Sequence, residues 1–145
     1  MDEVNARACI AHDVVRELFP DLQAQHIDWV GSSYISGVTD TDVDMLVYSG
    51  DIKPLCLVDW DNRGSEPPGE PDVWTSYKKV VDGVEINIIL TNSIAYFRDW
   101  QCSAEVCKFL ELMGVHLTKG QVHGVHQIIM DGGTTAIQEA QVRTY

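Results

Sequence analysis

Apolar residues recur along the chain with two different periods, and these periods predict its helices and strands. Between residues 2 and 18 they repeat about every 3.6 positions, which indicates an amphipathic helix, and Pro20 ends it. Short runs rich in β-forming residues predict five strands, at 26–30, 43–48, 55–60, 74–81 and 84–90. Asp82 and Gly83 separate the last two strands, and this dipeptide is typical of a tight β-hairpin turn.

Two further helices are expected after the hairpin. Asn92 or Ser93 can cap the first one, which runs to about Met113 and is followed by Gly114. Its apolar face consists of Phe97, Trp100, Ala104, Cys107 and Leu110. The second helix is expected over residues 119–130, before a pair of glycines that would end it.

The remaining segments lack a regular apolar period. Residues 61–72 are rich in proline, glycine and charge, which predicts a long loop, and the tail from 134 has no clear assignment. The order of elements is typical of an α/β (α+β) fold with a short mixed β-sheet flanked by α-helices. We expect the helices to pack on one side of the sheet and the chain, 1–145, to form a single domain.

Charge narrows the range of partners. The chain has 10 Lys and Arg residues against 22 Asp and Glu residues, so its formal net charge is −12 and its isoelectric point is near 4.5. Nonspecific nucleic-acid binding relies on cationic side chains that neutralise phosphates, and the sequence therefore argues against it. No apolar run reaches the roughly 18 residues that span a membrane. The acidic start does not resemble a signal peptide, so we expect a cytoplasmic protein without membrane contact.

Three aspartates occupy alternate positions just before and within the predicted strand 43–48. In an extended chain Asp42 and Asp44 point to one face and Val43 to the other. Asp40 belongs to the segment that leads into the strand. Two neighbouring carboxylates repel each other, and a fold tolerates this best when a cation lies between them. Mg²⁺, or Mn²⁺ in its place, binds such carboxylates together with substrate phosphates, so the pair predicts a metal site.

Glu85 is the candidate third acid. On the predicted strand after the hairpin turn it shares a face with Asn87, opposite a row of apolar residues. If this strand lies beside 43–48, three carboxylates converge, which is enough to hold two metal ions for a phosphoryl displacement. The alternative is an exposed edge hairpin in which Glu85 pairs with Lys78 or Lys79 across the turn.

Gly31, Ser32 and Ser33 follow the predicted strand 26–30. A chain that leaves a strand through glycine frees backbone N–H groups, and the two serine hydroxyls add further donors. Such a group of donors can hold phosphate oxygens. We therefore expect the phosphates of a nucleotide to bind at these three residues.

The spacing between Gly31-Ser32 and the pair Asp42 and Asp44 resembles the signature of the polymerase-beta-like nucleotidyltransferase superfamily. The match is closest in character to small single-domain members, including the minimal nucleotidyltransferases of toxin–antitoxin pairs and phage-type proteins. The resemblance implies nucleotidyl transfer from an NTP with Mg²⁺. It also implies that the Gly-Ser loop holds the triphosphate, that Asp42 and Asp44 bind both metals, and that Glu85 completes the site beside the attacking hydroxyl.

Two features depart from the family pattern. The third acid is usually Asp, whereas Glu85 carries one more methylene group. Many small members have Arg-Gly after the Gly-Ser pair, whereas this chain has Ile35-Ser36-Gly37 there, so the charge of the triphosphate needs another partner. The cationic candidates are Lys78, Lys79, Arg98 and Lys119. Of these, we assign Lys79 to the nucleotide site.

Other residue types permit further interpretations. A zinc site would use Cys102, Cys107, His123 and His126. Their spacing matches no usual zinc pattern, so we favour structural cysteines, and histidines that lie on helix surfaces. The four tryptophans could stack on bases, but packing is favoured for most of them, with Trp60 or Trp74 beside the long loop as the exception.

These inferences predict one enzymatic function and one rival. The chain is expected to transfer NMP, most simply AMP from ATP, to a hydroxyl group on a small molecule or a protein. The short, acidic chain leaves little room for a template- or tRNA-binding part, and a toxin-like protein partner fits the antitoxin-like pattern. The rival is a catalytically weak or inactive binding module of the same fold, which acts as an antitoxin or a nucleotide sensor.

Overall fold

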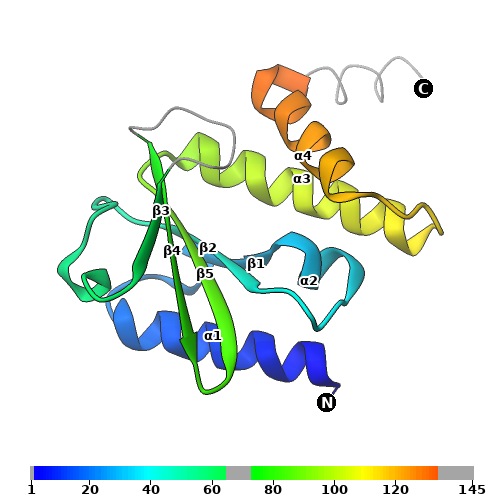
Figure 1. The fold of residues 1–145 in the computed structure, drawn as a ribbon. Coiled ribbons are helices and arrows are strands. Elements are labelled where there is room, and N and C mark those ends of the chain that lie inside the picture. Colours follow the sequence, from blue (N-terminus) through cyan, green and yellow to red (C-terminus); the bar gives the residue numbers. More distant parts are fainter. Residues whose placement is uncertain (1, 65–72, 134–145) are drawn as a thin grey trace.

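The computed structural model describes residues 2–64 and 73–133, which form a five-stranded sheet between helices (Figure 1). The strands are β1 (Ile27–Val30), β2 (Val43–Tyr48), β3 (Asp61–Gly64), β4 (Trp74–Val81) and β5 (Val84–Thr91). The helices are α1 (Glu3–Leu18), α2 (Gly31–Ser36), α3 (Ile94–Leu112) and α4 (Lys119–Ile128). Short helical turns cover Ala24–His26, Leu55–Leu57 and Ile129–Gly133. No described helix is both long enough and apolar enough to cross a membrane.

The sheet is mixed, with the strand order β1-β2-β5-β4-β3. β2 and β5 are parallel, whereas the other neighbouring strands are antiparallel. A mixed sheet flanked by helices confirms the predicted fold class. The expected position of 84–90 beside 43–48 is also confirmed, and in this register Asp44 lies opposite Asn87.

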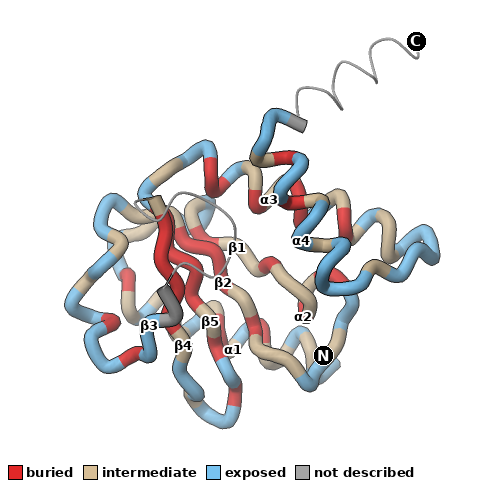
Figure 2. The backbone as a smooth tube through the Cα atoms, turned by 45° about the horizontal axis from the view of Figure 1, so that its top comes forward, coloured by how far each residue is buried: buried red, intermediate tan, exposed pale blue. Residues whose placement is uncertain are grey.

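Helices cover both faces of the sheet, with α1 on one side and α3 on the other (Figure 1). The core on the α1 side includes Val43, Met45, Val47, Ile86, Ile88 and Leu90. Leu46 and Ile89 point the other way and pack with α3. The expectation of helices on one side only is wrong, because β2 and β5 are apolar on both faces and each face needs a cover. Buried residues accordingly run along these central strands (Figure 2).

Local sequence signals placed most elements correctly. Asp82 and Gly83 have φ of 52° and 78°, the left-handed conformations that a tight hairpin turn requires. Ser93 caps α3, since its side chain accepts a hydrogen bond from the Tyr96 backbone N–H at 3.2 Å. The bounds of α1, β2, α3 and α4 agree with expectation to within about two residues.

The segment 55–60 is not a strand, contrary to expectation. Leu55–Leu57 forms a helical turn, and the side chains of Leu55 and Val58 are 87% and 80% exposed. The third strand is instead β3, at the start of the predicted loop, where it pairs with β4. An edge strand forms through backbone hydrogen bonds to its neighbour, and the polar sequence of β3 does not reveal them. The rest of that loop and the tail from 134 lie outside the described residues.

Candidate functional site

Asp42 and Asp44 lie on the same face of the sheet, at the start of β2. Val43 between them is fully buried in the core on the α1 side, so strand alternation turns both carboxylates toward α3. Both aspartates line a cavity of about 230 Å³, whose other walls come from α2, β4, β5, α3 and α4. The two predicted carboxylates therefore line one cavity together with residues from five other elements.

The backbone of Gly31 lies directly against the Asp44 carboxylate. A Cβ atom placed on Gly31 would lie 2.0 Å from Asp44 Oδ2, far closer than side chains approach each other. Gly31 also has φ of 80°, a conformation that strains any other residue. Glycine is therefore required at the first position of α2. The Gly-Ser segment and the second aspartate, 13 positions apart in the sequence, meet at this contact.

Arg7 of α1 holds the segment that leads into Asp42. Its guanidinium donates one hydrogen bond to the Thr39 carbonyl oxygen and a second, at 2.7 Å, to the Thr41 carbonyl oxygen. A planar guanidinium that donates to two carbonyls restrains both their position and their orientation. The sequence around Arg7 gives no sign of this role, because the partners of Arg7 lie more than thirty positions away.

Asn87 of β5 takes the place directly opposite Asp44. Its Nδ2 donates a hydrogen bond to Asp44 Oδ1 at 2.9 Å. Its Oδ1 is buried and has no hydrogen-bond partner among the described residues. A buried acceptor without a partner is costly, and amide and carboxylate oxygens are the ligand type that Mg²⁺ and Mn²⁺ prefer. Asp42, Asp44 and Asn87 thus fit the predicted cation.

Glu85 lies near the aspartates but does not join them. Its side chain is 50% exposed, and Oε1 lies 4.0 Å from Lys78 Nζ. Lys78 Nζ in turn lies 2.9 Å from Asp42 Oδ2. Within residues 2–64 and 73–133, no three His, Cys, Asp or Glu side chains form a group that could hold a metal. The expected convergence of three carboxylates is therefore replaced by two carboxylates, the Asn87 amide and a lysine.

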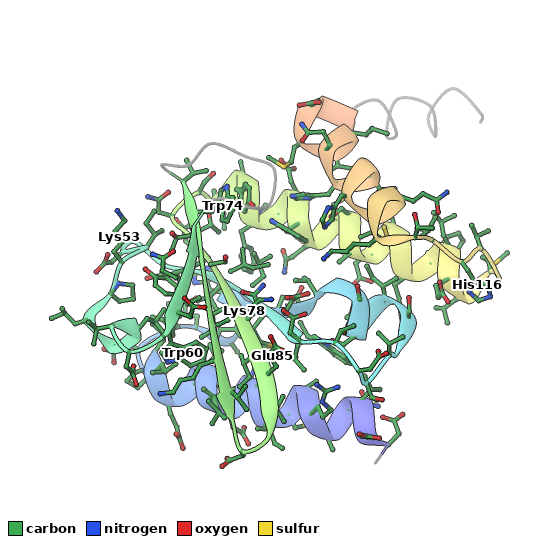
Figure 3. The ribbon with its side chains drawn as sticks, in the orientation of Figure 1. Lys53, Trp60, Trp74, Lys78, Glu85 and His116 are labelled. Carbon is green, nitrogen blue, oxygen red and sulfur yellow. The ribbon has the colours of Figure 1, made fainter. Side chains whose placement is uncertain are left out.

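The Lys78–Glu85 pairing was the alternative left open by the sequence, but its setting differs from the one foreseen. The hairpin is not at an edge, because β5 lies in the centre of the sheet and β4 lies between β5 and β3. Figure 3 labels Lys78 and Glu85 close together on the two strands of this hairpin. Lys78 thus reaches from β4 across β5 to the aspartates.

The Asp44 carboxyl holds its proton unusually well. Burial and the neighbouring Asp42 charge raise the pKa of Asp44 to about 7, against the opposing effects of the Asn87 hydrogen bond and the Lys78 and Lys119 charges. The contact with Asp42 and burial act in opposite directions on Lys78, and the hydrogen bond to Asp42 dominates, so the pKa of Lys78 is raised. The two aspartates therefore share the site with a full positive charge on Lys78.

Lys79 and Ser33, both predicted to bind the nucleotide, do not line the cavity. Strand alternation turns Lys79 to the opposite face, where its Nζ contacts Asp59 at 2.6 Å. Lys78 and Lys119 line the cavity instead. Ser33 is buried and its Oγ accepts a hydrogen bond from Trp29 Nε1 at 2.8 Å, so only Gly31 and Ser32 of that segment line the cavity.

One face of α4 closes the cavity. Lys119, Val122 and His123 line it, at the one-turn spacing that places side chains on one side of a helix. His126 continues this face and is buried, not on the surface as expected, and its ring centroid lies 4.0 Å from that of Trp100. Burial lowers the pKa of His126 to about 4, so its ring is neutral in the folded protein.

The tryptophans expected beside a base are buried. Trp60 and Trp74 are 7% and 1% exposed and belong to the two cores, so neither offers a stacking face. Trp100 of α3 lines the cavity, but it is 8% exposed and the His126 ring lies against it. Of the cysteines considered for zinc, Cys107 is fully buried as a free thiol, in keeping with structural packing.

Comparisons of the chain with protein-family models, with curated proteins and with solved structures found no match. Any functional inference therefore rests on the residues and geometry described above.

Proposed function

We propose that this protein is a metal-dependent nucleotidyltransferase that transfers NMP, most simply AMP from ATP, to an acceptor hydroxyl group. The observation that carries the proposal is the contact of Gly31 with Asp44 at a cavity that also contains Ser32, Asp42 and two lysines. Adjacent carboxylates, a glycine-serine segment and cationic side chains are the groups that a nucleoside triphosphate with a divalent cation requires.

Asp42, Asp44 and Asn87 would hold Mg²⁺ or Mn²⁺. When bound, such a cation neutralises phosphate charge and helps to deprotonate an attacking hydroxyl group. Asp44 must release its proton to act as a ligand, and its pKa of about 7 means that this release occurs near neutral pH. Asn87 keeps the Asp44 carboxylate in place through its 2.9 Å hydrogen bond.

The other walls of the cavity suit the rest of the nucleotide. Ser32 lines it at the start of α2, and Lys119 lines it at the start of α4. Hydroxyl and ammonium groups bind phosphate oxygens, and we place the triphosphate between these two residues. Val122, with the small exposed part of Trp100, gives the cavity an apolar patch that a nucleobase can contact.

The acceptor is inferred from charge. With a net charge of −12, the chain repels nucleic-acid phosphates, so we propose a small molecule or a protein hydroxyl as the acceptor. A toxin-like protein would be one such acceptor, and a cytoplasmic location, where ATP is abundant, completes the proposal.

The test is metal-dependent release of pyrophosphate from labelled NTPs, measured with and without a cell lysate as the source of acceptors. We expect release with Mg²⁺ or Mn²⁺, and a loss of at least about 100-fold in Asp42→Asn and Asp44→Asn. Asp40→Asn is the matched control, because Asp40 is exposed on the approach to β2 and should leave the rate unchanged. Activity that survives both substitutions would show that the site is wrong.

A second function is favoured by a specific observation, the occupation of Asp42 by Lys78 at 2.9 Å. A protein whose carboxylates already have a cation could bind a nucleotide without turning it over, as an antitoxin or a nucleotide sensor. Calorimetric titration with ATP separates the two functions. If ATP binding requires Lys119 but no NTP gives pyrophosphate release or labelling, the protein is a binding module and the enzymatic function is contradicted.

A further inference from the structure

Lys78 occupies the position at Asp42 that a metal ion would need. The register of β4 and β5 places Lys78 opposite Asn87, on the face that carries the carboxylates. Its Nζ lies 2.9 Å from Asp42 Oδ2 and 4.0 Å from Glu85 Oε1. The ammonium therefore has one acid in direct contact and a second within a short movement.

We propose that Lys78 and a divalent cation exchange places at Asp42, and that Glu85 acts by receiving Lys78 rather than by binding the metal. This inference rests on the metal site of the proposed function. It assigns the third acid of the sequence motif a role that the motif by itself does not indicate.

Charge explains why the protein needs Lys78 when no metal is bound. Asp42, just before β2, and Asp44, within it, lie on the same face of the sheet, and their charges repel each other. The Lys78 ammonium offsets this repulsion through its contact with Asp42. A divalent cation at the same oxygens would repel the ammonium, because two positive charges in contact with one carboxylate also lie close to each other.

Geometry explains where Lys78 goes. An N–H···O hydrogen bond has a length of about 2.9 Å, so a shift of roughly 1 Å brings the ammonium into direct contact with Glu85. The lysine side chain is flexible, and both side chains have room to move, with exposed fractions of 29% and 50%. Lys78 and Lys119 both line the cavity in which phosphate oxygens would bind.

Glu85 fits the role of receiver better than the role of ligand. It forms no three-membered metal-binding group with the described acids and histidines. Asn87, two positions further along β5, lies opposite Asp44 and has the free buried oxygen. Asp42, Asp44 and Asn87 can therefore serve as the protein ligands without Glu85.

The test measures the affinity for Mn²⁺ alone, without nucleotide, by the loss of the free-ion paramagnetic resonance signal. Four full-length proteins are compared: the wild type, Lys78→Met, Glu85→Gln and the double variant. We expect Lys78→Met to bind Mn²⁺ about three- to tenfold more tightly, because the competing cation is gone. Glu85→Gln should weaken binding about two- to threefold in the wild type and leave it unchanged when Lys78 is already replaced.

Two results would overturn the exchange. If Glu85→Gln weakens Mn²⁺ binding equally in both backgrounds, Glu85 is a metal ligand. If Lys78→Met leaves the affinity unchanged, the ammonium does not compete. Lys78→Arg is a second variant with the opposite expected sign, because a guanidinium grips the Asp42 carboxylate with two donors and weakens Mn²⁺ binding.

Two further variants serve as controls. Lys79→Met removes the neighbouring charge on the opposite face and should not change the Mn²⁺ affinity. Asp42→Asn separates the two proposals. If Asp42→Asn does not reduce Mn²⁺ binding, the metal site itself is wrong. If binding depends on Asp42 but does not change when Lys78 is replaced, only the exchange is wrong.

Discussion

At the residue scale, Gly31 and Gly37 show how one sequence feature can have two meanings. Both have positive φ, 80° and 68°; Gly31 is the first residue of α2, and Gly37 follows its last residue. A Cβ at Gly37 would meet nothing within 4 Å, whereas a Cβ at Gly31 would lie 2.0 Å from Asp44 Oδ2. Gly37 is needed only for its backbone conformation, and Gly31 is needed also for its contact with the site.

This pair gives a matched test. Gly37→Ala should lower the free energy of unfolding by about 1 kcal/mol, the usual effect of a left-handed alanine, and should leave Mn²⁺ binding intact. Gly31→Ala should lower it by about 2 to 4 kcal/mol and should abolish Mn²⁺ binding, because Asp44 must move. Urea unfolding and the Mn²⁺ titration measure both effects. Equal effects of the two substitutions would contradict the contact.

At the scale of elements, the site depends on α1, which contributes no residue to the cavity wall. Arg7 donates hydrogen bonds to the carbonyl oxygens of Thr39 and Thr41, and these residues immediately precede Asp42. α1 is held on the sheet by its own apolar face, including Ala11 and Val15. The position of Asp42 is therefore set by packing on the far side of the sheet.

Arg7→Met should weaken Mn²⁺ binding about three- to tenfold while lowering the free energy of unfolding by only about 1 kcal/mol. Arg16→Met is the matched control on the same helix. Arg16 donates to the Leu22 carbonyl oxygen at 2.8 Å, far along the chain from the aspartates, and its loss should affect stability alone. Equal changes in the Mn²⁺ affinity of both variants would show that Arg7 does not position Asp42.

At the scale of the whole molecule, two titratable groups, Asp44 and His126, act on stability in opposite directions. The pKa of Asp44 is raised from 3.8 to about 7, so between these values the folded protein binds more protons than the unfolded chain, and stability falls as pH rises. The pKa of His126 is lowered from 6.5 to about 4. Between these values the unfolded chain binds more protons, so stability is lost as pH falls.

Melting temperatures measured from pH 4 to 8 should separate the two groups. Asp44→Asn should melt above the wild type at pH 8, by a difference on the order of 5 °C, and should match it near pH 4. His126→Phe should instead raise the melting temperature relative to the wild type near pH 4. Phenylalanine does not titrate, so the variant does not lose the stability that the wild type loses as pH falls. An Asp44→Asn difference that is the same at pH 4 and pH 8 would mean that the carboxyl is not titrating in this range.

Prediction from sequence succeeded for three signals that each lie within one element or turn. The period of α1, the turn at Asp82-Gly83 and the cap at Ser93 each depend on residues a few positions apart, and each is confirmed. It was wrong for 55–60, where an apolar run forms a helical turn, and for β3, whose strand character comes from its neighbour. It also placed His126 on a surface that tertiary packing covers.

By itself, the sequence determined that Asp42 and Asp44 share one face, because alternation along an extended strand is a local property. Only the tertiary structure decided what meets them. The parallel register of β2 and β5 places Asn87 rather than Glu85 opposite Asp44, and the hairpin brings Lys78 to Asp42. Register between strands that are distant in sequence depends on how whole faces pack, and a shift by one residue would reverse every side chain. No short stretch of sequence contains that information.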